Sequence, residues 1–546
     1  MRLPQQTLET KKVPHILILG SGYVTITAAR GLQKAIRRKE VEVTVISREN
    51  FHCFHGFVGE MITGRVSPGS IVSPVRRIIG AAYLYVANIE HIDMEAQQIT
   101  VSRLNDGSRT DLRYDHLLIA LGSADNLEIY PGLKEHGFCL KTYEECFRVK
   151  NHILKMFEQA GTTNDPEERK ALLTFVIAGG GYAGTEIAGE MSDFARLLTS
   201  KEYPHIRREE CRVILVCKTA TILPELRSGK GAAGYGNGHP TLVNYASGHS
   251  LKLGVEVKLD TSVTLATAGT VQLSNGEVIS TRTIINAVGT KAQAVIECLN
   301  LEKDPKGRIV VNKDMTVKGW SNVWAGGDCA ALPHPKGDYC PSVGIFALKG
   351  GAHFAKNVLR KIRSKPLKEF SYVGIGQGVS IGRRTAVVEL SGVRIRGLLA
   401  WILWRVLLVY YFPTWDRRLR LLADWIIWPF VGRDIVQLTA GNEDNRELKT
   451  YRFEAGQEIL EAIRNTRFEH LLVQGKVEVV SAGIVAHTFA EGDYLLLDAG
   501  LPESTSLRAK GEVRTLAVKK EFLPLLHKQS MKKNLRKVGA VSELQG

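Results

Sequence analysis

The sequence predicts an α/β protein with two Rossmann-like dinucleotide-binding domains, a C-terminal amphipathic membrane-anchoring helical segment and an appended all-β roll. Three observations lead to this fold class. Two apolar segments each run into a glycine-rich turn, an apolar and arginine-rich stretch lies near residue 400, and short alternating segments separated by glycines follow residue 450. At 546 residues the chain is long enough for several buried cores.

The better preserved glycine-rich turn follows the apolar run Phe175–Ala178. This run is typical of a buried strand, and it leads directly into GGGYAG and a helix-forming segment. Glycines in such a turn permit a tight bend, the approach of the backbone to a pyrophosphate and close packing of helix on strand. We therefore expect a dinucleotide to contact Gly179, Gly181 and Gly184.

The first glycine-rich turn, near the N-terminus, is an imperfect copy. A strand precedes Gly20-Ser-Gly22, but Thr25 takes the third fingerprint position, where a small residue usually lets helix and strand pack closely. The next strand ends at Ser47, where an acidic residue usually binds the ribose; Ser47 can still hydrogen-bond a hydroxyl. The alternative interpretation is a nucleotide-free turn in a doubly wound domain.

The acidic ribose position of the second unit is also altered. At the end of the strand Val213–Val216 the sequence has Cys217, with Lys218 beside it. Loss of the acid weakens the preference for an unphosphorylated ribose, and the lysine could accept a 2′-phosphate, so the expected hydride donor is NADH or NADPH. An equally good interpretation is that Cys217 is simply a small buried residue.

Three further turns end predicted strands in small residues. YDHLLIALGS contains Ala120 and Gly122, and NAVGT contains Gly289; such turns close a dinucleotide domain in many flavoproteins. The strand in NVWAGGDCA delivers Gly327 and Asp328, and a carboxylate there can accept hydrogen bonds from the sugar-like chain of a cofactor.

The overall charge and the cysteines restrict the function classes. The net charge of +16 favours an acidic partner, but no helix-turn-helix, zinc-finger or aromatic RNA-binding signature accompanies it, so we expect no nucleic-acid partner. The eight cysteines are scattered without a CxxC or a His/Cys cluster, which predicts a reducing compartment, no redox disulfide and no metal site. No apolar segment of signal-peptide length precedes the first strand, so no export signal is expected.

Taken together, these segments resemble the two-dinucleotide-binding flavoprotein oxidoreductases, most closely the type II (non-proton-pumping) NADH dehydrogenases. The similarity covers roughly residues 15–436 and includes ENFHCFHGFVGEMITGRVSP, GGGYAGTEIAGEM and the tail GIGQGVSIGRRTAVVELSGVRIRGLLAWILWR. The resemblance implies FAD on the first glycine turn, with Ser47, Arg48 and Asp328 among its contacts, and NADH or NADPH on the second turn.

The resemblance also implies a catalytic position. Glu186 matches the glutamate that lies near the flavin and nicotinamide in that family, where a carboxylate can orient the hydride donor or relay a proton. The alternative is a glutamate that complements the helix dipole. In the family a stretch of the form AQxAxQQG lines the quinone site, but residues 341–350 contain no glutamine here. A quinone-like acceptor must be held differently, and we expect Lys349 or backbone groups to hold it.

The apolar stretch Leu398–Phe412 is fifteen residues long and contains Arg405, whereas crossing a bilayer takes about 20 apolar residues. A second apolar stretch, Leu421–Val431, follows an arginine-rich segment, and the pattern suits an in-plane anchor on an anionic lipid surface. The alternative is a helical hairpin buried in a dimer interface. The resemblance implies peripheral attachment, and we expect the cytoplasmic face of the inner (plasma) membrane and a homodimer.

After a charged linker, residues 451–527 show short alternating strands separated by glycine turns, which predicts an all-β roll. The segment resembles the β-roll of cyclic-nucleotide-binding domains, but leucines replace the Gly-Glu pair of the phosphate cassette and Glu503 falls near the expected arginine. This predicts a degenerate roll that serves as a structural or protein-contact module.

The expected organisation has six parts: FAD-binding segments at 13–135 and 300–365, an NAD(P)H-binding domain at 170–295, the anchoring segment at 366–440, the β-roll at 450–527 and a basic tail at 528–546. The leading hypothesis is an FAD-dependent NAD(P)H dehydrogenase that passes electrons to a membrane quinone or a similar acceptor. The alternative is a redox-degenerate, membrane-tethered sensor or scaffold regulated through its β-roll.

Overall fold

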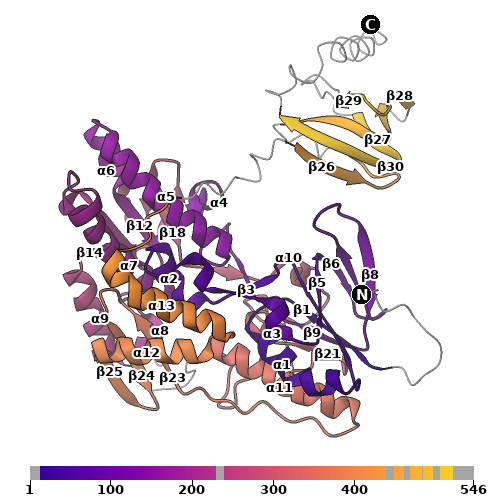
Figure 1. The fold of residues 1–546 in the computed structure, drawn as a ribbon, viewed down its shortest axis with the longest axis horizontal. Helices are drawn as coiled ribbons and strands as arrows, with labels where there is room; N and C mark the ends of the chain where they lie inside the picture. The colour runs from indigo at the N-terminus through magenta and orange to yellow at the C-terminus, as the bar shows by residue number, and fades with distance from the viewer. Residues whose placement is uncertain are drawn as a thin grey trace. The chain divides into compact units, whose positions relative to one another are not determined.

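The computed structural model describes residues 13–228, 239–437, 448–459, 468–481, 484–495 and 505–519. The chain divides into two compact units (Figure 1). The first holds the described residues up to 437 except 101–110, and the second holds residues 101–110 and the described residues from 448 onward. All of the site chemistry below lies in the first unit.

The first unit contains a five-stranded parallel sheet in the order β21-β9-β1-β2-β5. Its register aligns Leu19 with Ile46 and with Ile119, and Ile119 with Ala325. The carboxyl ends of four strands therefore meet at one edge. The five strands of this sheet are β1 (His15–Leu19), β2 (Glu42–Ser47), β5 (Tyr83–Val86), β9 (His116–Ile119) and β21 (Val323–Ala325).

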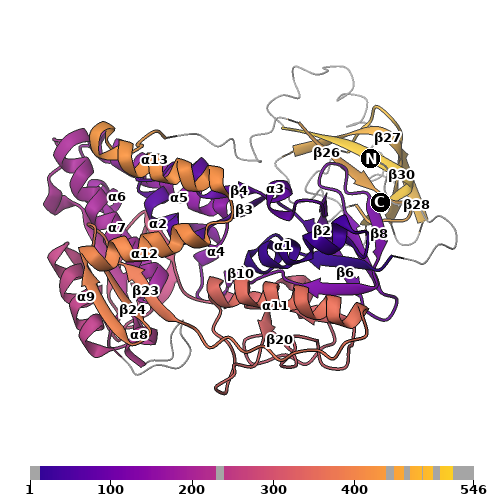
Figure 2. The same ribbon diagram turned by 60° about the horizontal axis from the view of Figure 1, so that its bottom comes forward.

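Helices α1 (Tyr23–Arg37) and α11 (Gly344–Ile362) pack against each other beside this sheet (Figure 2). Their close approach requires glycine, because a Cβ on Gly351 would lie 2.0 Å from the carbonyl oxygen of Val24. This contact brings residues near position 350 next to the first glycine-rich turn.

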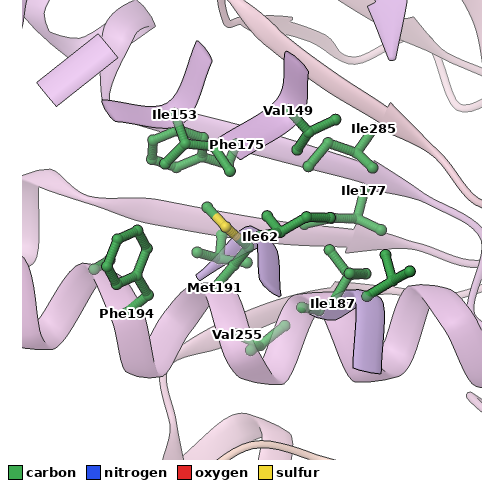
Figure 3. Close-up of a cluster of buried hydrophobic side chains, with 14 of the residues drawn as sticks. Ile62, Val149, Ile153, Phe175, Ile177, Ile187, Met191, Phe194, Val255 and Ile285 are labelled. Carbon is green, nitrogen blue, oxygen red and sulfur yellow. The ribbon is translucent and has the colours of Figure 1, made fainter. Parts of the chain in front are cut away.

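A second five-stranded parallel sheet has the order β11-β18-β12-β13-β14. Its edge strand β11 precedes residue 170, so this sheet begins earlier in the chain than the predicted NAD(P)H-binding domain. Helix α7 (Tyr182–Leu197) contributes apolar side chains such as Ile187, Met191 and Phe194 to the core below the sheet (Figure 3). The strands are β11 (Gly137–Phe138), β12 (Thr174–Ala178), β13 (Arg212–Val216), β14 (Val255–Lys258) and β18 (Thr283–Asn286).

A three-stranded antiparallel sheet and two helices follow: β23 (Gly376–Ser380), β24 (Ala386–Leu390), β25 (Val393–Gly397), α12 (Leu398–Tyr411) and α13 (Trp415–Val431). Helix α12 packs on all three strands, and both helices expose many apolar side chains. Among the described residues, no helix has the length and hydropathy needed to cross a bilayer. The predicted anchoring segment is thus a small sheet with two partly buried helices.

The remaining elements of the first unit connect these layers or cap them. The helices are α2 (Val58–Ile62), α3 (Val75–Ile79), α4 (Leu133–His136), α5 (Tyr143–Thr162), α6 (Pro166–Leu172), α8 (Pro224–Ser228), α9 (Pro240–Lys252) and α10 (Ala294–Glu297). The strands include β3 (Phe51–Cys53), β4 (Val72–Pro74), β6 (Asn88–Asp93), β10 (Ala124–Asp125), β15 (Val263–Ala266), β16 (Thr270–Leu273), β17 (Val278–Ser280), β19 (Thr290–Lys291), β20 (Ile309–Val310) and β22 (Ala330–Ala331).

The described part of the second unit beyond residue 447 consists of antiparallel strands in the order β26-β30-β27-β28, with β29 paired to β27. The strands are β26 (Leu448–Phe453), β27 (Phe468–Ser481), β28 (Ile484–Phe489), β29 (Tyr494–Leu495) and β30 (Thr505–Lys519). The altered cassette, residues 496–503, and the predicted basic tail lie outside the described residues.

Candidate active site

A cavity of about 1080 Å³ lies where the carboxyl ends of both parallel sheets meet. The loops after β1, β2, β9 and β21 form one side, and the start of α7 and the loop after β18 form another. Ligands of open parallel sheets bind at this kind of edge. The predicted residues that line the cavity are Gly20, Gly22, Ser47, Arg48, Ala120, Gly122, Glu186, Gly289, Gly327 and Asp328.

The first glycine turn is shaped for close approach to a ligand. Gly20 has a φ of +97°, and a Cβ there would lie 2.4 Å from the carbonyl oxygen of Ala120. A Cβ on Gly22 would meet no atom within 4 Å, so its backbone faces open space. The unexpected Thr25 is accommodated, since its hydroxyl donates to the carbonyl oxygen of Gly20 at 2.7 Å. The first glycine-rich turn, which departs from the fingerprint at Thr25, therefore still forms a tight turn.

Asp328 faces the same cavity from the end of β21. Its Oδ2 accepts a hydrogen bond from Lys141 Nζ at 3.0 Å and one from Ser123 Oγ at 3.4 Å. Sequence reasoning identified Asp328 but missed Lys141, because nothing local to Lys141 shows that the fold brings it beside this carboxylate. Arg48 is held by Glu49, whose carboxylate accepts from Arg48 Nε at 2.7 Å.

The second glycine turn requires glycine at two positions. Gly179 has a φ of +112°, and a Cβ on Gly184 would lie 1.8 Å from the carbonyl oxygen of Gly179. Cys217 packs directly beneath this turn, because a Cβ on Gly180 would lie 2.2 Å from its sulfur. Burial raises the pKa of the Cys217 thiol to about 12, so this position carries no negative charge near neutral pH. Gly181 stands at the helix start, and Gly179, Gly181 and Gly184 do not themselves line the cavity.

Glu186, on the first turns of α7, lies in the cavity wall and is half-buried. A Cβ on Gly59 would lie 3.3 Å from its Cγ, so helix α2 covers one side of the side chain. Burial, together with the charges of Glu190 and Glu60, raises the pKa of Glu186 well above its usual range. A carboxyl in this state can hold a proton near neutral pH.

Behind Glu186 lies a buried network of charged side chains that sequence reasoning missed. Arg65 donates to Glu190 at 3.0 Å and to Asp193 at 2.9 Å. Arg433 also donates to Asp193. Since Arg65 comes from the segment after α2 and Arg433 follows α13, the network ties the end of the anchoring segment to α7.

Lys349, the predicted acceptor-binding residue, also lies away from the cavity. Its side chain is exposed, and its ammonium lies 5.4 Å from the centre of the Tyr372 ring. The cavity is instead lined by Gly344, Ile345, Ala347 and Leu348 of the same helix. Because the Lys349 side chain is exposed and does not line the cavity, we do not retain it as an acceptor-binding residue.

Two parallel sheets that each lead into a glycine-rich turn, beside one cavity at their carboxyl ends, are typical of a two-dinucleotide-binding oxidoreductase. Residues 14–351 match the family described as pyridine nucleotide-disulphide oxidoreductase, and residues 377–434 match the NDH2 C-terminal domain. The chain belongs to the pyridine nucleotide-disulphide oxidoreductase family and, within it, to the type II NADH dehydrogenases.

Relatives with similar sequences include two proteins of Mycobacterium tuberculosis. The type II NADH:quinone oxidoreductase NdhA is 30% identical over 77% of this chain and 87% of its own length. The type II NADH:quinone oxidoreductase Ndh is 28% identical over 78% of this chain and 90% of its own length. The structure of NDH2 from Plasmodium falciparum in complex with NADH shares the fold, with a TM-score of 0.69, 16% identity, and coverage of 78% of this chain and 100% of that chain.

Proposed function

We propose that the chain is an FAD-dependent NADH dehydrogenase that passes electrons from NADH to a quinone. The observation that carries the proposal is the shared cavity, in which the first glycine turn, Glu186 and the apolar side of α12 face the same space. The names of the relatives as NADH:quinone oxidoreductases support the same activity. The alternative, a redox-degenerate sensor or scaffold, is not favoured.

The residues of the first turn fit FAD. The open space at Gly22 lets a pyrophosphate approach the backbone, and the start of α1 offers unpaired N–H groups to it. Ser47 and Arg48 stand where the ribose and its neighbours would be held, and Asp328 where the ribityl chain would be held. Bound FAD supplies an acceptor for a hydride and a donor of two electrons.

Glu186 would hold and deliver a proton that the reduction of a quinone requires. Two electrons and two protons convert a quinone to a quinol, while NADH supplies a hydride, so one further proton must come from solvent. A carboxyl with a raised pKa beside the cavity can hold that proton and release it toward an acceptor. Lys141 keeps Asp328 in place and need not take part in proton transfer.

The absorbance spectrum of the purified protein tests the proposed function. We expect a flavin spectrum that NADH bleaches and that a menaquinone or ubiquinone analogue then restores under anaerobic conditions. NADPH should be tried in parallel, because no acidic side chain occupies position 217. Protein that holds no flavin after folding with added FAD, or flavin that NADH does not reduce, would contradict the proposal.

We also propose that α12 and α13 attach the protein peripherally to an anionic lipid surface, at the cytoplasmic face of the inner (plasma) membrane. Phe430 is 87% exposed and Ile426 is 67% exposed on α13, and Val406 is 61% exposed on α12. Arg417 and Arg418 bind backbone carbonyl oxygens, whereas Arg420 is exposed. Exposed apolar side chains beside cations suit an in-plane anchor.

Flotation with vesicles that contain phosphatidylglycerol tests this attachment. We expect wild-type protein to float and an Ile426→Glu/Phe430→Glu variant to stay in the dense fraction. Leu251→Glu on α9 is a matched control, because Leu251 is 61% exposed outside α12 and α13. Equal flotation of the wild type and the double variant would contradict the proposal. The predicted homodimer, and a protein-contact role for the second unit, stay predictions.

A further inference from the structure

Gln377 on β23 occupies a wall of the cavity that no sequence motif singled out. Its side chain is only 2% exposed, which is uncommon for a glutamine unless its amide groups are hydrogen-bonded. The stretch at residues 341–350 contains no glutamine and offers the cavity mainly apolar residues and backbone. Two glutamines line the cavity, Gln293 and Gln377, and both lie outside residues 341–350; of the two, Gln377 lies on the strand next to α12.

Tyr182 orients this amide. Its hydroxyl donates to Gln377 Oε1 at 2.7 Å, and Tyr182 is the first residue of α7, immediately after the second glycine turn. Gln377 Nε2 donates to no residue that the structure describes. Because the Tyr182 hydroxyl donates to the amide oxygen, the N–H groups of Gln377 Nε2 are available to donate to a carbonyl oxygen.

Apolar side chains of α12, Trp404, Leu408 and Tyr411 among them, line the same cavity as Gln377. A Cβ on Gly378 would lie 2.7 Å from the ring of Trp404, so β23 packs against α12 on the Gly378 face, and the Gln377 side chain lies on the opposite face, toward Tyr182. The outward side chains of α12, such as Leu399 and Val406, are more than half exposed. A cavity wall that combines these apolar side chains with a buried amide fits a ring that carries a carbonyl oxygen and an apolar tail.

We propose that Gln377, oriented by Tyr182, is the side chain that hydrogen-bonds a quinone carbonyl in this protein and so replaces the missing glutamines of residues 341–350. This inference rests on the proposed function and adds the residue that selects the acceptor. A site that hydrogen-bonds a buried carbonyl discriminates against acceptors that cannot pair with it, because the amide is then left unsatisfied. Gln377 is a binding residue here, and Tyr182 is a positioning residue.

Steady-state kinetics of the full chain with Gln377→Met test the proposal. Methionine keeps the volume and removes the amide. We expect the KM for a short-tailed ubiquinone or menaquinone analogue to rise roughly tenfold. Turnover with ferricyanide and the stopped-flow rate of flavin bleaching by NADH should stay within about twofold of wild type. Tyr182→Phe should raise the same KM by a smaller factor.

Ser380→Ala is the matched control, because Ser380 is a buried polar residue of the same strand that does not line the cavity. It should leave the KM for quinone unchanged. A second readout needs no turnover: quenching of tryptophan fluorescence by the quinone analogue, reported by Trp404, should show a dissociation constant about tenfold higher in Gln377→Met.

The possible outcomes distinguish a failure of the proposed function from a failure of the role given to Gln377. Wild-type protein without NADH-reducible flavin overturns the proposed function. Wild-type protein that reduces quinone, combined with a Gln377→Met variant of unchanged KM and unchanged dissociation constant, overturns the role of Gln377 alone. Equal losses with quinone and with ferricyanide would show that Gln377 supports the fold or the flavin and not the acceptor, which also overturns the proposal.

Discussion

Glu60 on α2 and Arg405 on α12 form a buried ion pair, although 345 positions separate them in the chain. Trp425 of α13 donates to the other carboxylate oxygen of Glu60 at 3.1 Å, and the Arg405 guanidinium lies 3.7 Å from the centre of the Trp401 ring. One carboxylate thus joins both helices of the anchoring segment to the helix beside Glu186.

Removing one partner of this pair should be costly. Glu60→Gln leaves the Arg405 charge buried without its counter-charge, so we expect the free energy of unfolding to fall by about 3–5 kcal/mol. Denaturant unfolding measures it. Glu60→Leu combined with Arg405→Met should cost less than the sum of the two single changes, because no unpaired charge remains. The solvent-exposed pair Glu40–Arg363 is the control, and Glu40→Ala should change the free energy of unfolding far less than Glu60→Gln does.

The first glycine turn allows two substitutions with different outcomes. Gly22→Ala adds a methyl group to open space, so the fold should tolerate it while the FAD content of purified protein falls. Gly20→Ala adds a methyl group 2.4 Å from a carbonyl oxygen at a left-handed φ, so it should lower the melting temperature of the apoprotein itself. Flavin absorbance and thermal melts of the FAD-free protein measure the two effects. Full flavin content in Gly22→Ala would show that the turn does not carry the cofactor.

The choice of hydride donor should respond to position 217. Cys217→Asp places a carboxylate at the end of β13, where it can bind a ribose hydroxyl and repel a 2′-phosphate. We expect the ratio of kcat/KM for NADH to that for NADPH to rise roughly tenfold, which corresponds to one charge-assisted hydrogen bond. Lys218→Ala should lower NADPH turnover more than NADH turnover. An unchanged ratio in both variants would place the ribose elsewhere.

The raised pKa of Glu186 has a consequence for stability. Unfolded glutamate ionises near pH 4.5, but burial keeps the native carboxyl protonated to higher pH. Between these two pKa values the native state holds a proton that the unfolded state has released, so this group's stabilising contribution is lost as pH rises. We expect Glu186→Gln to flatten the decline of melting temperature with rising pH.

Glu256→Gln provides a control of opposite sign for that pH series. Two hydrogen bonds from Arg212 hold the pKa of Glu256 below its usual value. The stabilising contribution of the ionised Glu256 carboxylate is therefore present above the pKa of the unfolded state, and it is lost as pH falls through the pKa of the native state. Glu256→Gln should cost stability near neutral pH and progressively less in acid. The same pH dependence in both variants would contradict the assignment for Glu186.

The parts of the fold that follow from local chemistry were predictable from the sequence. A glycine turn between a buried strand and a helix depends on residues next to one another, so both turns were predicted where the structure has them, whereas the second sheet begins with β11, before residue 170. The direction in which a side chain of helix α11 points could not be predicted from neighbouring residues. Lys349 was predicted at the cavity, but the register of α11 turns it toward Tyr372.

Contacts between distant segments account for the remaining differences. Arg405 looked like an interruption in a membrane-facing helix, and only its pairing with Glu60 shows that it faces inward. Gln377 and Lys141 carried no sequence signal, because each gains its meaning from a partner on another element. The sequence left two interpretations of Cys217, a specificity position and a packing residue; its contact beneath Gly180 agrees with packing, and the variants at position 217 test its part in specificity.

The position of β23 and α12 in the chain has a consequence for biosynthesis. The glycine turns of the cavity are made early, whereas Gln377 and the apolar side chains of α12 leave the ribosome only after both parallel sheets are complete. Domains begin to fold during synthesis from the N-terminus. A nascent chain released before residue 377 therefore presents cofactor-binding turns without an acceptor wall, and a reduced flavin bound to it would meet dioxygen before it met a quinone.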